Sequence, residues 1–122
     1  MTQDITHYKK LLGEERTALE QKLNALGRRM LRNPDEWEAT SPEVEHESER
    51  GDVAMNIERY NEREALTLEL QTRYKEVADA LERIHKNTYG LCTAFGKPHP
   101  IEKKRLDADP AGRTCIAHMR AS

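Results

Sequence analysis

The feature that most constrains the fold is a heptad pattern in the second half of the chain. Its positions are Val53, Tyr60, Thr67, Tyr74 and Leu81 at a, and Leu70, Val77 and Ile84 at d. Residues at this spacing lie along one side of an α-helix, so the pattern predicts a long helix with an apolar seam. The middle of the seam is polar, around Arg63, Glu64 and Thr67. We interpret Tyr60 and Tyr74 as seam residues rather than as platforms for stacking on nucleic-acid bases.

An apolar stripe near the N-terminus predicts a first helix with a similar seam. Its members follow one another at steps of three, four or seven: Ile5, Tyr8, Leu12, Leu19, Leu23, Leu26 and Met30. Thr2 or Asp4 would cap the start of this helix. We expect it to end before Pro34, because proline disfavours helical geometry in the residue that precedes it. Two facing stripes predict an antiparallel helical hairpin with arms of about 45 Å.

Composition narrows the class of protein. The chain has 122 residues, which is ordinarily one domain, and only 36% of them are hydrophobic while 34% are charged. That balance favours long helices over a large compact core. No apolar run approaches the roughly 20 residues of a membrane span, and a signal-peptide segment is missing, so we expect a cytoplasmic protein without membrane contact. In that compartment the two cysteines are thiols or metal ligands rather than a structural disulfide.

The segment between the two expected helices, residues 33–52, is acidic. It contains one base, Arg50, and eight acids: Asp35, Glu36, Glu38, Glu43, Glu45, Glu47, Glu49 and Asp52. Ser41 and Pro42 resemble a helix start, which would add a short turn inside this loop. Trp37 either packs against the helix ends or faces a partner, and we favour packing, the commoner use of a lone aromatic side chain.

The C-terminal part carries the opposite charge. Its seven bases are Lys86, Lys97, Lys103, Lys104, Arg105, Arg113 and Arg120, against the acids Glu102, Asp107 and Asp109. The two ends of the molecule should therefore have potentials of opposite sign. Within this part, the segment from Asn87 to Gly90 carries a glycine stop signal for the second helix.

The most specific pattern in the chain follows that stop. It consists of three segments: 89–97 (YGLCTAFGK), 101–110 (IEKKRLDADP) and 115–118 (CIAH). A zinc knuckle needs two ligand pairs in tight turns, so that four donors can form a tetrahedron. Cys92, Cys115 and His118 keep the spacing of such a frame.

These segments resemble the C-terminal signature of the DksA/TraR family. The positions that match it are Tyr89, Gly90, Cys92, Gly96, Ile101, Arg105, Leu106, Ala108, Pro110 and Cys115. The resemblance extends over nearly the whole chain from Ile5, although the N-terminal half matches by architecture more than by motif. It implies a mainly α fold, with a long antiparallel coiled-coil hairpin over residues 1–88 and a small zinc-finger-like module over residues 89–122.

The departures from the family pattern fall on the metal site. Phe95 occupies the second cysteine position and cannot be a ligand, and His118 replaces the fourth cysteine. Zinc could bind through Cys92, Cys115 and His118, with His99 from a two-residue insertion or a water molecule as the fourth ligand. The alternative is that the metal is lost and Phe95 supplies apolar packing in its place. From the sequence we favour loss of the zinc.

The family resemblance also implies a function. In that family the coiled coil enters the secondary channel of bacterial RNA polymerase and brings an acidic tip near the catalytic centre, which alters initiation. The family tip reads Asp-x-x-Asp-x-Ala, and Glu49, Asp52 and Ala54 match it here, with glutamate for the first aspartate. Carboxylates at a tip suit a site lined by basic residues and Mg²⁺. We therefore expect a transcription regulator whose partner is RNA polymerase.

Other functions were weighed against this one. No nucleophile or phosphate-loop motif is present, so we do not expect an enzyme, and a role in stimulating transcript cleavage by the polymerase would be a variation of the same function. The basic tail would contact acidic protein surface or bind nucleic acid nonspecifically, although direct DNA binding is not expected. Arg105 is a candidate contact for a ppGpp-type nucleotide, but we take it first as a structural arginine. The main rival is a helical-hairpin adaptor or nucleic-acid-binding protein with a degenerate zinc knuckle that does not act on polymerase.

Overall fold

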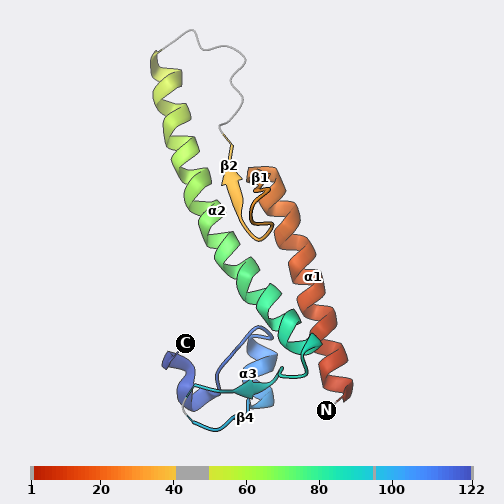
Figure 1. The fold of residues 1–122 in the computed structure, drawn as a ribbon. Helices are drawn as coiled ribbons and strands as arrows, with labels where there is room; N and C mark the ends of the chain where they lie inside the picture. The colour runs from red at the N-terminus through yellow and green to blue at the C-terminus, as the bar shows by residue number, and fades with distance from the viewer. Residues whose placement is uncertain (1, 41–49, 95, 122) are drawn as a thin grey trace. The chain divides into compact units, whose positions relative to one another are not determined.

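The computed structural model describes residues 2–40, 50–94 and 96–121, and the chain is mainly helical (Figure 1). The helices are α1 (Thr2–Leu26), α2 (Arg50–His85), α3 (Lys103–Ala108) and the 3-10 helix η1 (Ile116–Ala121). Two short antiparallel pairs of strands accompany them, β1 (Gly27–Arg29) with β2 (Trp37–Ala39), and β3 (Leu91–Cys92) with β4 (His99–Pro100). The predicted helical class is confirmed, whereas the long coiled-coil hairpin stays a prediction.

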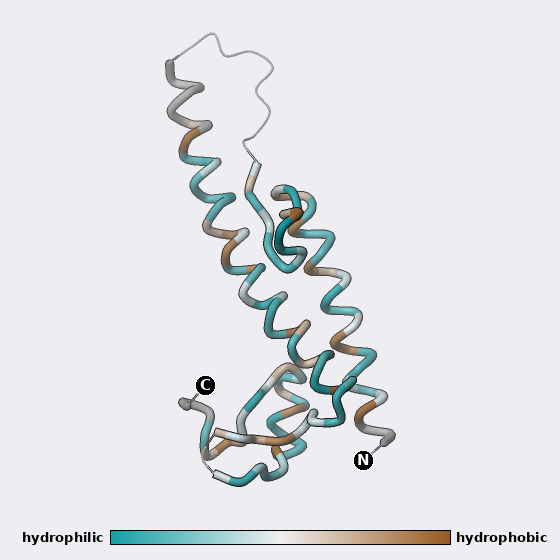
Figure 2. The backbone as a smooth tube through the Cα atoms, in the orientation of Figure 1, coloured by the Kyte–Doolittle hydropathy of each residue, from teal (hydrophilic) through white to brown (hydrophobic). Residues whose placement is uncertain are grey.

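The chain forms two compact units. The first contains Met1–Thr17 and Glu76–Ser122, and the second contains Ala18–Lys75. Both long helices contribute a part to each unit, so each unit is described by itself. Figure 2 shows apolar positions recurring along both long helices between hydrophilic stretches, which is the pattern of helices with a single buried side.

In the second unit, the first helix ends before Pro34, as expected, but it ends earlier than the apolar stripe up to Met30 indicated. α1 ends at Leu26, and Gly27 already pairs with Ala39 in the antiparallel ladder of β1 and β2. The physical reason is a close approach of two backbone segments, because a Cβ atom on Gly27 would overlap the carbonyl oxygen of Glu38. Only glycine allows the chain to turn back here, so the helix stops and Met30 leaves the helical stripe.

The loop between β1 and β2 is held by its own hydrogen bonds. The Met30 amide donates to the Glu36 carbonyl at 2.8 Å, and the Glu36 amide donates to the Asn33 carbonyl at 3.0 Å. The Asn33 side chain accepts from the Asp35 amide at 3.2 Å, which forms an Asx turn around Pro34. Part of the predicted acidic loop is therefore an ordered β-hairpin.

Trp37 anchors this hairpin, which confirms the packing interpretation. Its side chain is 4% exposed, and its indole N–H donates to the Asn24 side chain at 2.8 Å. The ring lies edge-on to Tyr74 with centroids 5.0 Å apart, and the Arg29 guanidinium lies 4.5 Å from the ring centroid. The Trp37 backbone amide donates to Gln71 at 2.8 Å. Strand β2 is thus fixed to α1 and α2 through one residue.

Among the α2 side chains that the structure describes, the fully buried ones lie from Thr67 onward. In the second unit Thr67 and Tyr74 are buried, and in the first unit Val77 and Ala80 are buried. Ile57, further toward the start of the helix, is 57% exposed. The Tyr74 hydroxyl accepts a hydrogen bond from Arg29 and donates one to Glu20. A seam tyrosine therefore also connects α1 to the β-hairpin.

In the first unit, α2 ends at His85, just before the predicted stop segment, and Asn87 rather than Gly90 makes the stop. Asn87 has a φ of 62° and takes the left-handed position that the sequence assigned to Gly90. The Thr88 amide donates to the Arg83 carbonyl at 2.8 Å, and the Asn87 amide donates to the Ile84 carbonyl at 3.2 Å. These two bonds define a Schellman motif, with asparagine in place of the more usual glycine.

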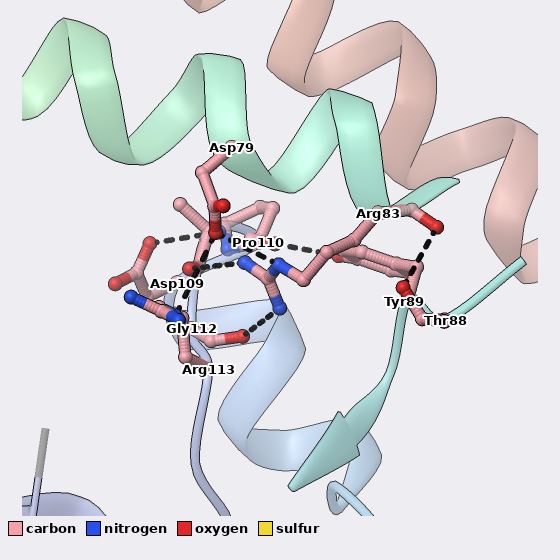
Figure 3. Close-up of polar contacts among 9 residues, drawn as sticks. Asp79, Arg83, Thr88, Tyr89, Asp109, Pro110, Gly112 and Arg113 are labelled. Atoms are coloured by element: carbon pink, nitrogen blue, oxygen red, sulfur yellow. Dashed lines mark hydrogen bonds and ion pairs between the residues drawn. The ribbon is translucent and has the colours of Figure 1, made fainter. Parts of the chain in front are cut away.

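Polar contacts join the end of α2 to the segment that follows α3 (Figure 3). Arg83 donates to Asp79 at 3.0 Å and to the carbonyl oxygens of Ala111 and Gly112 at 3.2 and 3.4 Å. Nearby, the Tyr89 hydroxyl donates to the Pro110 carbonyl at 2.6 Å. Burial is the main cause that lowers the pKa of Arg83, and the charge of Asp79 opposes it. This network positions the chain that leads to Cys115.

Candidate metal centre

Four metal-ligand side chains meet in the first unit. They are Cys92 on β3, His99 on β4, Cys115 just before η1 and His118 within η1, and their ligand atoms all lie within 4.8 Å of one another. The Cys92 Sγ lies 3.4 Å from His118 Nδ1, and the Cys115 Sγ lies 3.3 Å from the same nitrogen. The His99 Nε2 lies 3.3 Å from Cys115 Sγ. One atom from each residue therefore faces a common point.

Local structure explains how the four residues come together. Cys92 and His99 are direct cross-strand partners in the β3–β4 ladder, so their side chains project from the same face. Cys115 and His118 are three residues apart, and the His118 amide donates to the Cys115 carbonyl at 3.0 Å. In this tight turn, residues i and i+3 lie above one another. Each pair is thus preformed by backbone geometry.

The donor set fits Zn²⁺. Two thiolates and two imidazoles form one of the usual structural zinc sets, with metal bonds of about 2.3 Å to sulfur and about 2.0 Å to nitrogen. In a tetrahedron these bond lengths separate sulfur from nitrogen by about 3.6 Å. The observed sulfur to nitrogen distances of 3.3 and 3.4 Å are only slightly shorter. Small outward shifts would accommodate the ion.

The orientation of His99 is set by a second contact. Its Nδ1 lies 3.2 Å from the Lys97 carbonyl oxygen. A carbonyl oxygen can only accept, so Nδ1 carries the proton and the lone pair of Nε2 points to the cluster. Metal-bound histidines are commonly oriented by such a bond from the other ring nitrogen. His99 is therefore presented in the tautomer that a metal requires.

The electrostatics of the cluster favour a thiolate at Cys92. Complete burial of this side chain disfavours the charged form, but hydrogen bonds outweigh that effect and lower its pKa to about 6. The donors are the backbone at Ala94 and Cys115 and the side chains of His118 and Cys115.

A carboxylate lies beside the two histidines. Glu102 accepts a hydrogen bond from the Ile116 amide at 3.1 Å. Backbone hydrogen bonds, from its own amide first and then from Ile116, lower the Glu102 pKa. Burial opposes this change, and the nearby His99 and His118 lower the Glu102 pKa by smaller amounts. Glu102 thereby joins the start of α3 to the turn that presents Cys115 and His118.

The structure brings together the three candidate ligands named from the sequence and His99, which was the possible fourth ligand beside water. From the sequence alone, loss of the zinc was favoured. The cluster assembled in the structure, however, could hold a metal ion. The only sequence signal for His99 was its place in the insertion after Lys97. Phe95, on which the argument for metal loss depended, lies outside the described residues.

The structure does not describe the side chains of the predicted acidic tip residues. Glu49 lies outside the described residues. Asp52 and Ala54 fall in the first turns of α2, and their side chains also lie outside the described part of the chain. Arg105 pairs with Asp109 at 4.0 Å, and its side chain is 17% exposed, which supports the structural interpretation of this arginine.

Within the residues that the structure describes, neither the two long helices nor the shorter ones have an apolar stretch of membrane-spanning length. The two free cysteines, Cys92 and Cys115, are both in the cluster.

The fold and the cluster together define a small helical protein with a C-terminal Cys/His finger. No family model and no curated protein matches the sequence. Among solved structures, the chain is similar to transcription factor DksA2 from Pseudomonas aeruginosa, with a TM-score of 0.66 and 22% sequence identity. The similarity covers 95% of this chain and 80% of that chain. The DksA/TraR-like fold expected from the C-terminal motif is confirmed.

Proposed function

We propose that this protein regulates transcription by binding bacterial RNA polymerase, as a regulator rather than an enzyme. The observation that carries the proposal is the similarity to DksA2 over 95% of the chain, a protein that is itself a transcription factor. The C-terminal motif, from Tyr89 to Cys115, supports the same family independently of the fold comparison. Agreement of the fold comparison with the sequence motif supports the function more strongly than either observation alone, because a fold by itself does not define a function.

The working part of the molecule in this proposal is the tip between the long helices. A coiled-coil hairpin would carry Glu49, Asp52 and Ala54 into the secondary channel of the polymerase. There the carboxylates would be attracted by basic side chains and would perturb the contacts of Mg²⁺ or nucleotides. The small side chain of Ala54 would allow the helix start to approach the channel wall closely.

Zinc is the proposed structural cofactor of the finger. Cys92, His99, Cys115 and His118 would hold the ion, and the bound metal would cross-link the β3–β4 pair to the C-terminal turn. Structural zinc in small modules contributes on the order of 10 kcal/mol to folding. The role of the metal here is to fix the finger, without taking part in any reaction.

The direct test is binding to core RNA polymerase combined with transcription in vitro. The wild-type protein should bind the polymerase and change the output of promoters. The Asp52→Asn variant removes one tip charge, so it should still bind but lose most of the effect on transcription. Glu58→Gln is the matched control, because Glu58 is an exposed acid on the same helix.

Each outcome separates the proposal from its rival. A wild-type protein that fails to bind polymerase would sink the proposal and favour an adaptor that binds another macromolecule. If Asp52→Asn and Glu58→Gln behave alike, the tip is not the working part even though the protein binds polymerase.

A further inference from the structure

The β1–β2 hairpin presents an unusual combination of side chains in the second unit. Here the name hairpin knob denotes residues 28–32, which follow α1 and precede the turn at Pro34. Leu31 is fully exposed, with 101% relative exposure, and Met30 is 38% exposed. The exposed arginines Arg28 and Arg32 flank these apolar residues. Together with Glu38, the knob lines a shallow hollow of about 520 Å³.

The knob is rigid enough to act as a recognition element. Its base is the three-residue ladder of β1 and β2, and its turn is closed by the bond from the Met30 amide to the Glu36 carbonyl at 2.8 Å. Arg29 contacts Trp37 and Tyr74, which fixes the middle of β1 on the helices. A preformed loop loses little conformational freedom on binding, so its exposed side chains can contribute more of their contact energy.

The charges of the knob are not neutralised by the rest of the described chain. Among the residues that the structure describes, the side chains of Arg28 and Arg32 have no ion pair or hydrogen bond. Arg29 is different, because it lies 3.7 Å from Glu20. Glu38 is the cross-strand neighbour of Arg28 and reduces the local charge, but the two side chains form no ion pair. Two guanidinium groups therefore remain available to a partner.

We propose that the hairpin knob docks onto an acidic protein surface that has an apolar recess. Arg28 and Arg32 would pair with its carboxylates, and Leu31 would fill the recess. Arginine and methionine are enriched in protein interfaces, and arginine matches carboxylates with two parallel hydrogen bonds. A nucleic-acid backbone would satisfy the arginines but would leave Leu31 in water. The inference rests on the proposed function, because the surface is assigned to RNA polymerase as a contact separate from the tip.

The experiment measures the affinity of the full-length protein for core RNA polymerase at two salt concentrations, in the absence of nucleic acid. The double variant Arg28→Gln/Arg32→Gln should bind about tenfold more weakly at low salt and show a shallower salt dependence, because two charge pairs are lost. Leu31→Ser should weaken binding about fivefold at both salt concentrations, since its contact is apolar.

Matched controls remove similar groups elsewhere. Lys9→Gln/Lys10→Gln takes away two exposed charges on α1, and Leu68→Ser takes away an exposed apolar side chain on α2. Both should bind within about twofold of the wild type. Circular dichroism and thermal unfolding check that every variant remains folded, which is expected because all of the changed side chains are exposed.

Several results would overturn the inference. If the wild type binds polymerase and the knob variants bind with the same affinity as the wild type or as their controls, the knob is not a contact. The proposed function then still stands. If the knob variants differ from the wild type only when DNA or RNA is added, the knob recognises nucleic acid instead. If the wild type itself does not bind, both the proposed function and this inference fail. Photo-crosslinking from position 31 should also reach an acid-rich segment of a polymerase subunit, and a crosslink to a segment without acids would count against the knob.

Discussion

At the scale of single residues, Tyr89 shows how burial and one hydrogen bond make a side chain sensitive to pH. The ring is 9% exposed, and its hydroxyl donates to the Pro110 carbonyl at 2.6 Å. Burial raises the pKa of Tyr89 to about 12, and the nearby charge of Arg83 acts in the opposite direction. A phenolate could not donate this hydrogen bond, so the folded state holds the neutral form.

The consequence for stability has a definite sign. An unfolded tyrosine has a pKa near 10, so the contribution of Tyr89 is fully present below about pH 10. It is lost as the pH rises through the folded pKa of about 12. We expect Tyr89→Phe to be less stable than the wild type by about 1 to 2 kcal/mol at neutral pH, because the Pro110 carbonyl loses its donor.

Urea unfolding of the two proteins between pH 9 and pH 12 measures this effect. The advantage of the wild type should fall by roughly 2 kcal/mol between pH 10 and pH 12, so that it is lost or reversed at the upper end of this range. Tyr60→Phe is the control for removing a tyrosine hydroxyl elsewhere in the chain, because Tyr60 is half-buried on α2. A constant difference for Tyr89→Phe would show that the Tyr89 hydroxyl is not held in its neutral form by the fold.

At the scale of secondary-structure elements, the two glycines of the N-terminal region have opposite roles. Gly13 lies within α1, and no atom lies within 4 Å of where its Cβ would be. A Cβ on Gly27 would overlap the backbone of Glu38. The same substitution by alanine should therefore stabilise the protein at one position and destabilise it at the other.

Gly13→Ala should raise the unfolding free energy by about 0.5 to 1 kcal/mol, because alanine is the better helix former. Gly27→Ala should lower it by about 2 kcal/mol or more, because the backbone pairing of β1 and β2 must open. Chemical unfolding gives both values, and the fluorescence of Trp37 reports directly on the hairpin. A red-shifted emission is expected for Gly27→Ala alone. If this variant keeps the wild-type spectrum and stability, the hairpin does not require glycine at position 27.

The secondary-structure elements that could be predicted from the sequence are those with a repeating pattern of apolar residues. The heptads from Val53 to Ile84 indicated α2, and the burial of Tyr74 and Val77 follows the same pattern. The β1–β2 hairpin has no such repeat, because each strand has only three residues and β1 contains two arginines. Its signals were Gly27 and Trp37, and the close backbone approach at Gly27 is a tertiary contact that no local pattern contains.

For the candidate metal centre as well, some ligands could be predicted from the sequence and one depends on the fold. Cys92, Cys115 and His118 could be named from spacing, because ligand pairs in tight turns have a fixed separation along the chain. His99 reaches the cluster through the pairing of β3 with β4, which depends on a register that the sequence did not reveal. The expectation of metal loss came from the apolar Phe95 at a ligand position, whereas the pairing of β3 with β4 brings His99 to the cluster as a fourth donor.

At the scale of the whole molecule, the Cys/His cluster joins three parts of the first unit. It includes residues of β3, β4 and the turn into η1. The two strands also pair with each other, and the Ile116 amide in that turn donates to Glu102. A small module with so few buried side chains depends on a cross-link for its stability. Zinc would supply that cross-link.

Metal analysis of the purified chain and its thermal unfolding with and without a strong chelator test this role. We expect about one zinc per chain, a marked loss of thermal stability on chelation, and loss of the metal in Cys115→Ser.

His99→Ala should bind zinc at least about tenfold more weakly, because the remaining three ligands leave one position to water. His85→Ala is the matched control, because His85 is an exposed histidine at the end of α2, and it should bind zinc like the wild type. Cobalt substitution adds an independent readout, since tetrahedral Co²⁺ with two thiolates has absorption bands that His99→Ala should alter and His85→Ala should not. A chain that is purified without zinc and melts at the same temperature with chelator would instead support the interpretation that apolar packing has replaced the metal.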